Sequence, residues 1–142
     1  EQDMAIARQL GLDPLALQAE HDVERLAREK PVVGLVTDLI AEAVRRRASD
    51  IHIRPGERGA DVLYRIDDEL VPVRRFIRAL LPAVVSRVKV LGDINLAEHR
   101  KPQDGRTTFT LADGRKVDLR ISVMPAVFGE SVVIRLLDAS EG

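Results

Sequence analysis

A three-residue turn between two alternating segments constrains the fold of this chain more than any other feature. Thr107–Leu111 and Lys116–Arg120 flank Ala112-Asp113-Gly114. A connection of this length that ends in Gly suits a type I turn closed by a left-handed residue, as in an antiparallel hairpin. Because side chains alternate between the faces of a strand, the pattern predicts one polar face and one buried face. The buried face comprises Thr107, Phe109, Leu111, Val117, Leu119, Ile121 and Val123.

The polar face of this hairpin carries two arginines opposite each other. If Leu111 pairs with Arg115, then Arg106 faces Arg120. Two adjacent guanidinium groups repel unless an anion or a carboxylate lies between them, and such a pair suits bidentate binding of phosphate. The alternative is that Asp118, on the same face, neutralises its arginine neighbours on a solvated surface, since exposed charge patterns are weak functional signals.

The composition restricts the class of protein and its ligands. With 142 residues, a hydrophobic fraction of 45% and an aromatic fraction of 3%, the chain suits one domain with an aliphatic core. The net charge of −1 argues against a nucleic-acid partner. Without Cys, and with three widely separated His, the sequence predicts no metal site and no disulfide. No apolar run is long enough for direct membrane insertion.

Apolar periodicity and turn residues predict an α+β fold, in which an antiparallel sheet packs against helices in two layers. The expected elements are a helix at Pro31–Arg47, strands at Ile51–Arg54 and Asp61–Ile66, a helix at Pro82–Leu91 with a candidate extra turn at Phe76–Leu81, and three strands within Arg106–Leu137. Val132–Leu137 is nearly all apolar and suits a central strand. Arg87 and Lys89 are expected to face solvent.

Residues 1–30 differ from the rest and are interpreted as a helical linker or the remnant of an upstream domain. Asp13-Pro14 is a good helix start. The helix that follows, to Glu29, has a thin apolar stripe that suits docking on another surface better than building a core. Packing of this helix on its own domain is the alternative, and the sequence leaves both open.

Several longer stretches, taken together, are similar to one protein family. They are ASDIHIRP at Ala48–Pro55, YRIDDEL at Tyr64–Leu70, SRVKVLGDINLAEHRKPQDGR at Ser86–Arg106, VDLRISVMP at Val117–Pro125 and GESVVIRLLD at Gly129–Asp138. These stretches resemble the secretion ATPases, the hexameric motor proteins of type II secretion and type IV pilus assembly. The resemblance is to the domain just before the motor domain, and it assigns residues 31–142 to that domain.

The resemblance also indicates what this chain lacks. The motor domain of the family carries a phosphate-binding loop, G-x-x-x-x-G-K-[ST], and no Gly here is followed by Lys-Ser or Lys-Thr. We therefore expect an excised domain with no catalytic residue and no cofactor of its own. ATP and Mg²⁺ would belong to the parent protein, which the resemblance implies is an ATPase.

The resemblance further implies the site, the partners and the location. Arg106 and Arg120 match the arginines with which this domain reaches the phosphates of nucleotide held by the motor domain. Arg100 and Arg135 are further candidates, and Arg135 could instead belong to a structural ion pair. The expected role is regulation and subunit packing. The expected partners are motor domains of the same or a neighbouring subunit and platform proteins of the inner membrane, which would hold a cytoplasmic protein peripherally at that membrane.

Two other classes of function remain as alternatives. An α+β sensor or small-ligand-binding module would have a similar build. An RNA-binding domain is disfavoured, because the Gly56–Gly59 GxxG pattern lies between two predicted strands, whereas RNA-binding KH domains place it between helices.

Overall fold

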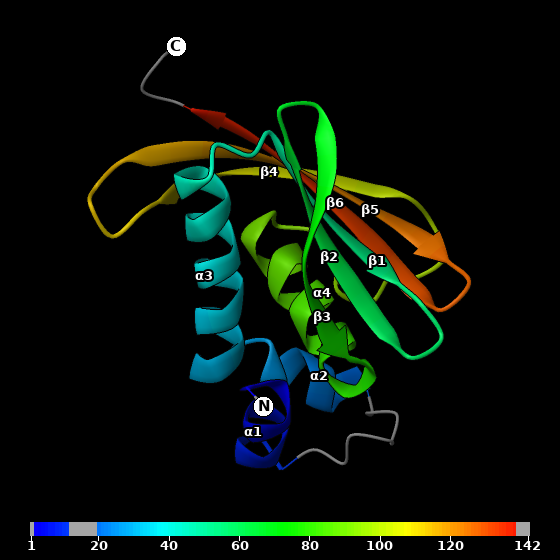
Figure 1. Cartoon of the computed structure of the whole chain (residues 1–142). Helices are drawn as coiled ribbons and strands as arrows, with labels where there is room; N and C mark the ends of the chain where they lie inside the picture. The colour runs from blue at the N-terminus through cyan, green and yellow to red at the C-terminus, as the bar shows by residue number, and fades with distance from the viewer. Residues whose placement is uncertain (1, 12–19, 139–142) are drawn as a thin grey trace.

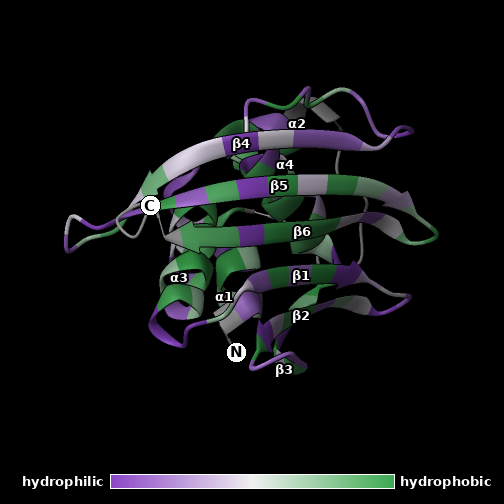
Figure 2. Ribbon diagram, turned by 90° about the horizontal axis from the view of Figure 1, so that it is seen from above, coloured by the Kyte–Doolittle hydropathy of each residue, from purple (hydrophilic) through white to green (hydrophobic). Residues whose placement is uncertain are grey.

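The computed structural model describes residues 2–11 and 20–138, and within them a single antiparallel sheet is covered by helices on one face (Figures 1 and 2). The helices are α1 (Gln2–Gln9), α2 (Glu20–Leu26), α3 (Lys30–Arg45), the 3₁₀ turn η1 (Arg78–Leu80) and α4 (Leu81–Leu91). The strands are β1 (Asp50–Pro55), β2 (Gly59–Ile66), β3 (Glu69–Ile77), β4 (Gln103–Thr110), β5 (Lys116–Ala126) and β6 (Gly129–Asp138). This arrangement confirms the predicted fold class.

The strand order is β3-β2-β1-β6-β5-β4, so the sheet consists of two meanders joined where β1 pairs with β6. Ile51 of β1 lies opposite Ile134 of β6, and both side chains are buried. β6 is a central strand, as its apolar sequence predicts. Figure 2 shows the strands side by side, with the helices behind them and the other face of the sheet open.

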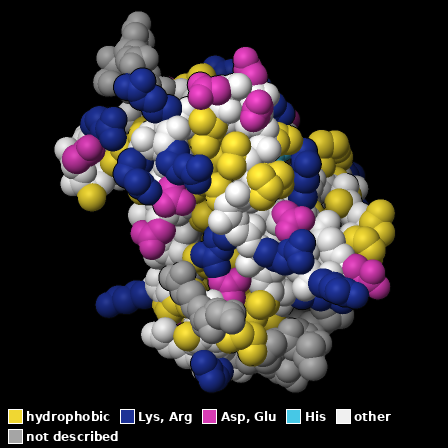
Figure 3. Space-filling view, viewed as in Figure 1, with side chains coloured by type: hydrophobic (Ala, Val, Ile, Leu, Met, Phe, Trp, Pro, Cys, Tyr) yellow, Lys and Arg dark blue, Asp and Glu magenta, His cyan; other side chains and the backbone are white. Residues whose placement is uncertain are grey.

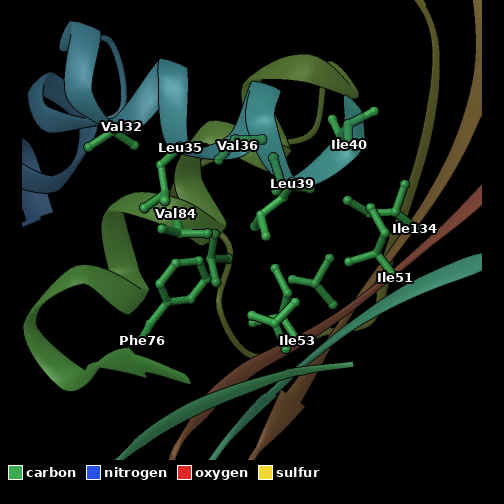
Figure 4. Packing of buried hydrophobic residues seen from close by; sticks show 14 of the residues in the cluster. Val32, Leu35, Val36, Leu39, Ile40, Ile51, Ile53, Phe76, Val84 and Ile134 are labelled. Atoms are coloured by element: carbon green, nitrogen blue, oxygen red, sulfur yellow. The ribbon is translucent and has the colours of Figure 1, made fainter. Parts of the chain in front are cut away.

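The core lies between the sheet and helices α3 and α4. α3 begins with Pro31 in its first turn, where the missing N–H has no helical partner to lose. Its buried face comprises Val32, Leu35, Val36, Leu39, Ile40 and Ala43, and Figure 4 shows this face directed toward the sheet. The buried Tyr64 hydroxyl donates a hydrogen bond to the Leu39 carbonyl (2.7 Å), which ties α3 to β2. Burial raises the pKa of Tyr64 above its usual range, so the phenol remains a donor.

The β4–β5 hairpin has the register that the sequence predicts. The Leu111 N–H donates to the Arg115 carbonyl (2.8 Å), and Arg106 lies opposite Arg120. Gly114 has φ +90°, the left-handed conformation that closes such a turn. The Gly56–Gly59 segment also closes a hairpin, between β1 and β2, with the Gly56 N–H donating to the Gly59 carbonyl (2.7 Å).

One strand was missing from the sequence prediction. β3 covers Glu69–Ile77, so the stretch from Phe76 begins as strand and becomes helical only at η1. The turn before β3 has both Asp67 (φ 51°) and Asp68 (φ 67°) in the left-handed region, which is the conformation of a type I′ hairpin turn. Pro72 is tolerated within β3 because β3 is an edge strand.

The described part of residues 1–30 packs on the domain itself. The Asp3 carboxylate pairs with Arg74 of β3 and accepts a hydrogen bond from the Ile77 N–H (3.1 Å). Ile6 of α1 and Leu26 at the end of α2 are buried in the main core cluster. The start of the predicted helix at Pro14, and half of its stripe, lie outside the described residues. Of the two alternatives, the described part agrees with packing on its own domain, and the boundary at residue 30 stays a prediction.

The expectation that Lys89 faces solvent is wrong. Its side chain is fully buried, and its ammonium pairs with Glu130 Oε2 (2.9 Å) and donates to the Glu98 carbonyl (2.6 Å). A buried ammonium is tolerated only with such partners. Glu130 Oε1 also lies 2.9 Å from His99 Nδ1, so this network ties α4 to β6 and to the segment that leads into β4.

Replacing Lys89 by Met should destabilise the domain by about 3 kcal/mol, because Glu130 would keep a buried carboxylate without its main counter-charge. The matched control is Arg87→Met on the same helix, which should change the free energy of unfolding by no more than about 0.5 kcal/mol. Urea denaturation of both variants measures the difference. Equal stability of the two variants would show that the Lys89 pair contributes nothing net.

Candidate functional site

The open face of the sheet carries a row of arginines at one register. Arg106 on β4 pairs with Arg120 on β5, and Arg120 pairs with Arg135 on β6. The same row continues through Asp50 on β1 to Arg65 on β2. We call Arg106, Arg120 and Arg135 the arginine row.

The arginine row lines a shallow hollow of about 710 Å³. Its other lining residues are Asp104, Gly105, Ile121, Ser122 and Val133. The Ser122 hydroxyl donates a hydrogen bond to Asp104 Oδ1 (3.0 Å), so Asp104 is held at one side of the hollow. The hollow is therefore rich in cations, with one anchored carboxylate at its edge.

The three arginines differ in their electrostatic surroundings. Asp50 is 6% exposed, and its carboxylate lies 3.3 Å from Arg135 Nε and 3.7 Å from Arg65 Nε. Arg135 is thus a member of a structural ion pair, which was the alternative for this residue. Among the described residues, neither Arg106 nor Arg120 has a carboxylate within 4.0 Å.

Asp118 does not form an ion pair with its arginine neighbours among the residues that the structure describes. Its Oδ1 instead accepts a hydrogen bond from the Thr108 hydroxyl, across the hairpin (3.0 Å). Arg106 and Arg120 therefore remain exposed and unneutralised by direct contact. This is the arrangement that an anionic ligand can complete.

Arg100 is not brought to the hollow. It lies in the segment before β4, where its backbone N–H donates to Glu98 Oε2 (2.8 Å). The sequence-predicted candidates therefore divide into three that line one hollow and one that does not. Asp50 was missed as part of the site. Its only sequence signal is its position one residue before an alternating strand, which places it on the polar face with His52.

Gly105 fixes the backbone that carries Arg106. A Cβ at this position would lie 2.5 Å from the Gly92 carbonyl oxygen and 2.7 Å from Ile94 Cγ1. β4 therefore lies directly on the turn that follows α4, and only glycine permits this approach. In the sequence PQDGR, the glycine sets the position and the arginine supplies the charge.

The sequence of this chain matches the family model described as "Type II/IV secretion system protein" over residues 25–142. The chain belongs to this family.

Curated relatives agree with the family match. The chain is 49% identical over 113 residues to "Type II secretion system protein E" of Xanthomonas campestris, covering 80% of this chain and 20% of the relative. It is 41% identical over 119 residues to "Type IV pilus assembly ATPase PilB" of Myxococcus xanthus, covering 84% of this chain and 21% of the relative. The chain thus spans about a fifth of the length of these secretion proteins.

A solved structure supports the fold. The Legionella pneumophila ATPase DotB matches with a TM-score of 0.51 and 18% identity, over 68% of this chain and 27% of that chain.

Among the described residues of this secretion-family domain, no helix is long and apolar enough to cross a membrane. The same residues contain no group of three or more His, Cys, Asp or Glu side chains that could hold a metal ion.

Replacing Gly105 by Ala in this secretion-family domain should lower the free energy of unfolding by about 2 kcal/mol, because the added methyl group meets backbone and cannot be relieved by a rotamer change. The matched control is Gly34→Ala in α3, where a Cβ meets nothing within 4 Å. That change should stabilise by about 0.5–1 kcal/mol through helix propensity. Denaturant midpoints measure both, and a Gly105→Ala variant as stable as the parent would contradict the close approach.

His52 gives the domain a pH dependence. The pKa of His52 is lowered, first by burial and then by the charge of Arg54, and the charge of Asp50 offsets only part of this effect. The folded state therefore resists protonation, and stability should fall as the pH drops through the unfolded value of about 6.5. His52→Gln should lose less stability than the parent between about pH 7 and about pH 5. Thermal melting across this range tests the prediction, which fails if the two proteins show the same slope.

Proposed function

We propose that this chain is the domain N-terminal to the motor domain of a hexameric ATPase that powers type II secretion or type IV pilus assembly. In this proposal, Arg106 and Arg120 contact the phosphates of a nucleotide held by a motor domain. Family membership and the names of the relatives support the first statement. The observation that carries the second is the cross-strand pair of exposed arginines without a carboxylate partner among the described residues.

The physical argument rests on where the positive charge is held. Backbone pairing holds Arg106 and Arg120 side by side on a rigid sheet, so little ordering is needed when an anion arrives. In the isolated domain the two charges face water, where salt screens them and an anion is held weakly. Against a motor domain, water would be excluded, and the same charges would act more strongly on a phosphate. Arginines supplied in this way stabilise charge on a transferring phosphoryl group.

The remaining parts of the ATPase belong to the proposed parent protein. ATP and Mg²⁺ would be held by its motor domain, since this sequence has no phosphate-binding loop. In the proposal, Arg106 and Arg120 would contact the phosphates of such a nucleotide, and as cations they provide no Mg²⁺ ligands. Subunit packing in the ring, a regulatory role and peripheral attachment to inner-membrane platform proteins from the cytoplasm are parts of the same proposal.

One observation favours the alternative of a small-ligand-binding module. An apolar cavity of about 470 Å³ lies between α2, α4 and the β5–β6 hairpin, with Leu81, Val85, Leu96 and Phe128 in its wall. It shares no lining residue with the hollow of the arginine row. A ligand in that cavity would not account for the exposed pair of Arg106 and Arg120, so we prefer the ATPase domain.

Changing Arg106 or Arg120 to Ala should leave this domain folded but lower the turnover of the full-length ATPase by about 10³-fold, as for other arginines that contact a transferring phosphoryl group. Both side chains lie on the exposed polar face, so the truncation removes no core volume. The matched control is Lys116→Ala, on the same face of β5 but outside the row, which should leave turnover unchanged.

Two measurements are paired in this test: thermal melting of the domain variants and turnover of the full-length variants at saturating ATP. Loss of folding would make these arginines structural. Unchanged turnover with intact folding would leave only the solvated-surface interpretation of the pair.

A further inference from the structure

A second basic surface lies at the C-terminal end of α3, away from the arginine row. Figure 3 shows dark blue side chains gathered over this end of the helix, on the upper left of the face in view. A hollow of about 630 Å³ lies here between the helix end, β6 and the start of β5. We call it the helix-end hollow; its lining residues are Val44, Arg45, Arg47, Ala48, Arg115, Val117 and Leu136. None of them lines the hollow of the arginine row.

The helix-end hollow combines an apolar lining with charged arginines. Val44 and Leu136 are half-buried and supply most of the exposed apolar surface, since Ala48 and Val117 are buried in the core, and Arg45, Arg47 and Arg115 supply the charge. Two of the arginines already have exposed partners: Arg45 pairs with Glu42 (2.8 Å) and Arg115 with Asp113 (3.0 Å). Within the described part of the chain, the exposed Arg47 has no ion pair. The hollow thus has an unneutralised positive charge beside apolar surface.

The backbone at Arg47 gives an independent indication of function. The Arg47 N–H donates to the Val44 carbonyl (3.0 Å) and the Ala48 N–H to the Ala43 carbonyl (2.8 Å), which is the hydrogen-bond pattern of a Schellman motif. Arg47 occupies the left-handed position of this motif, with φ 60°. Glycine is the usual residue there, and a side chain with a Cβ costs stability. Such strain, where a less strained residue would fold better, points to a role for the side chain.

The equivalent position of α4 provides a comparison within the same chain. Asp93, which follows Gly92, has φ 54°. Its backbone N–H donates to the Val90 carbonyl (3.2 Å), and the Ile94 N–H donates to the Lys89 carbonyl (2.9 Å). Asp is among the residues that tolerate the left-handed conformation, because its short side chain can bond locally. Arg has no such property. Its charge interacts favourably with the helix dipole, but Arg45 and Arg46 already supply positive charge at the end of α3.

We propose that the helix-end hollow binds an acidic peptide segment of a partner protein, with one large apolar side chain of that segment seated on the apolar lining. Carboxylates of the segment would pair with Arg47 and Arg115, and the guanidinium fork suits such bidentate contacts. The apolar lining favours this ligand over a bare phosphate, which would gain nothing from it. The recessed shape favours a protruding side chain over a flat bilayer. Of the exposed apolar residues, Met124 lies near the end of β5, Val127 and Phe128 form the β5–β6 turn, and none of the three lines this hollow.

The test uses a fluorescein-labelled peptide, Glu-Asp-Leu-Asp-Glu, titrated with this chain at low salt and followed by fluorescence anisotropy. Arg47→Gly should weaken binding roughly threefold, the size of one exposed ion pair, and should raise the melting temperature because the strain is relieved. The double variant Arg47→Glu with Arg115→Glu should weaken binding more than about tenfold, since both contacts become repulsive. A peptide with Ser in place of Leu should bind about tenfold more weakly.

Two control variants make the result specific. Arg58→Glu reverses an exposed charge in the loop between β1 and β2 and should leave peptide binding unchanged. Arg106→Ala removes the proposed phosphate contact and should also leave it unchanged, so this proposal and the proposed function can fail separately.

Three outcomes would overturn the proposal. The first is equal binding of the peptide to the parent and to the double charge-reversal variant. The second is equal binding of the Leu and Ser peptides, which would make the hollow a site for any anion. The third is sedimentation of the parent, but not the double variant, with phosphatidylglycerol vesicles that the peptide does not displace, which would make it a membrane contact.

Discussion

The pairing of β1 with β6 is the contact on which the rest of this structure depends. It joins two meanders that are distant in sequence, and it places Ile51 against Ile134 at the centre of the core. The same register places Asp50 beside Arg135, so the pairing also sets the charge pattern of the open face. A slip of one residue would turn the apolar side chains of β6 outward and end the ion pair at once. Core and site therefore share one constraint.

The local features of this chain could be predicted from its sequence. The turn chemistry at Gly114 fixed the hairpin register, and with it the opposition of Arg106 and Arg120. Helix α3 followed from its apolar periodicity and from Pro31. In each case the signal lies within a few residues of the structure it predicts. The family resemblance was likewise carried by contiguous motifs, and the family match agrees with it.

The features that were missed depend on residues distant in sequence. Lys89 is charged, yet it lies four positions after Val85 on the buried face of α4, and its burial depends on Glu130 from the start of β6. Asp50 neutralises Arg135, which is 85 positions away. β3 was not recognised because Pro72 and several charged residues break its alternation, which only an edge strand tolerates. The sequence indicates the local propensity of Lys89, Asp50 and β3. Whether each one is buried, paired or at an edge depends on residues that only the tertiary structure brings close.

The alignment of Arg106, Arg120 and Arg135 at one register has a consequence for how this surface can change during evolution. The lateral spacing of the row is the distance between hydrogen-bonded strands, about 4.8 Å, which every β-sheet shares. Substitutions in the core can tilt or shift the sheet, but they move all three residues together. Selection can alter the length, charge and number of the side chains in the row. The spacing between them is set by backbone hydrogen bonding and is the same for every sequence that adopts this fold.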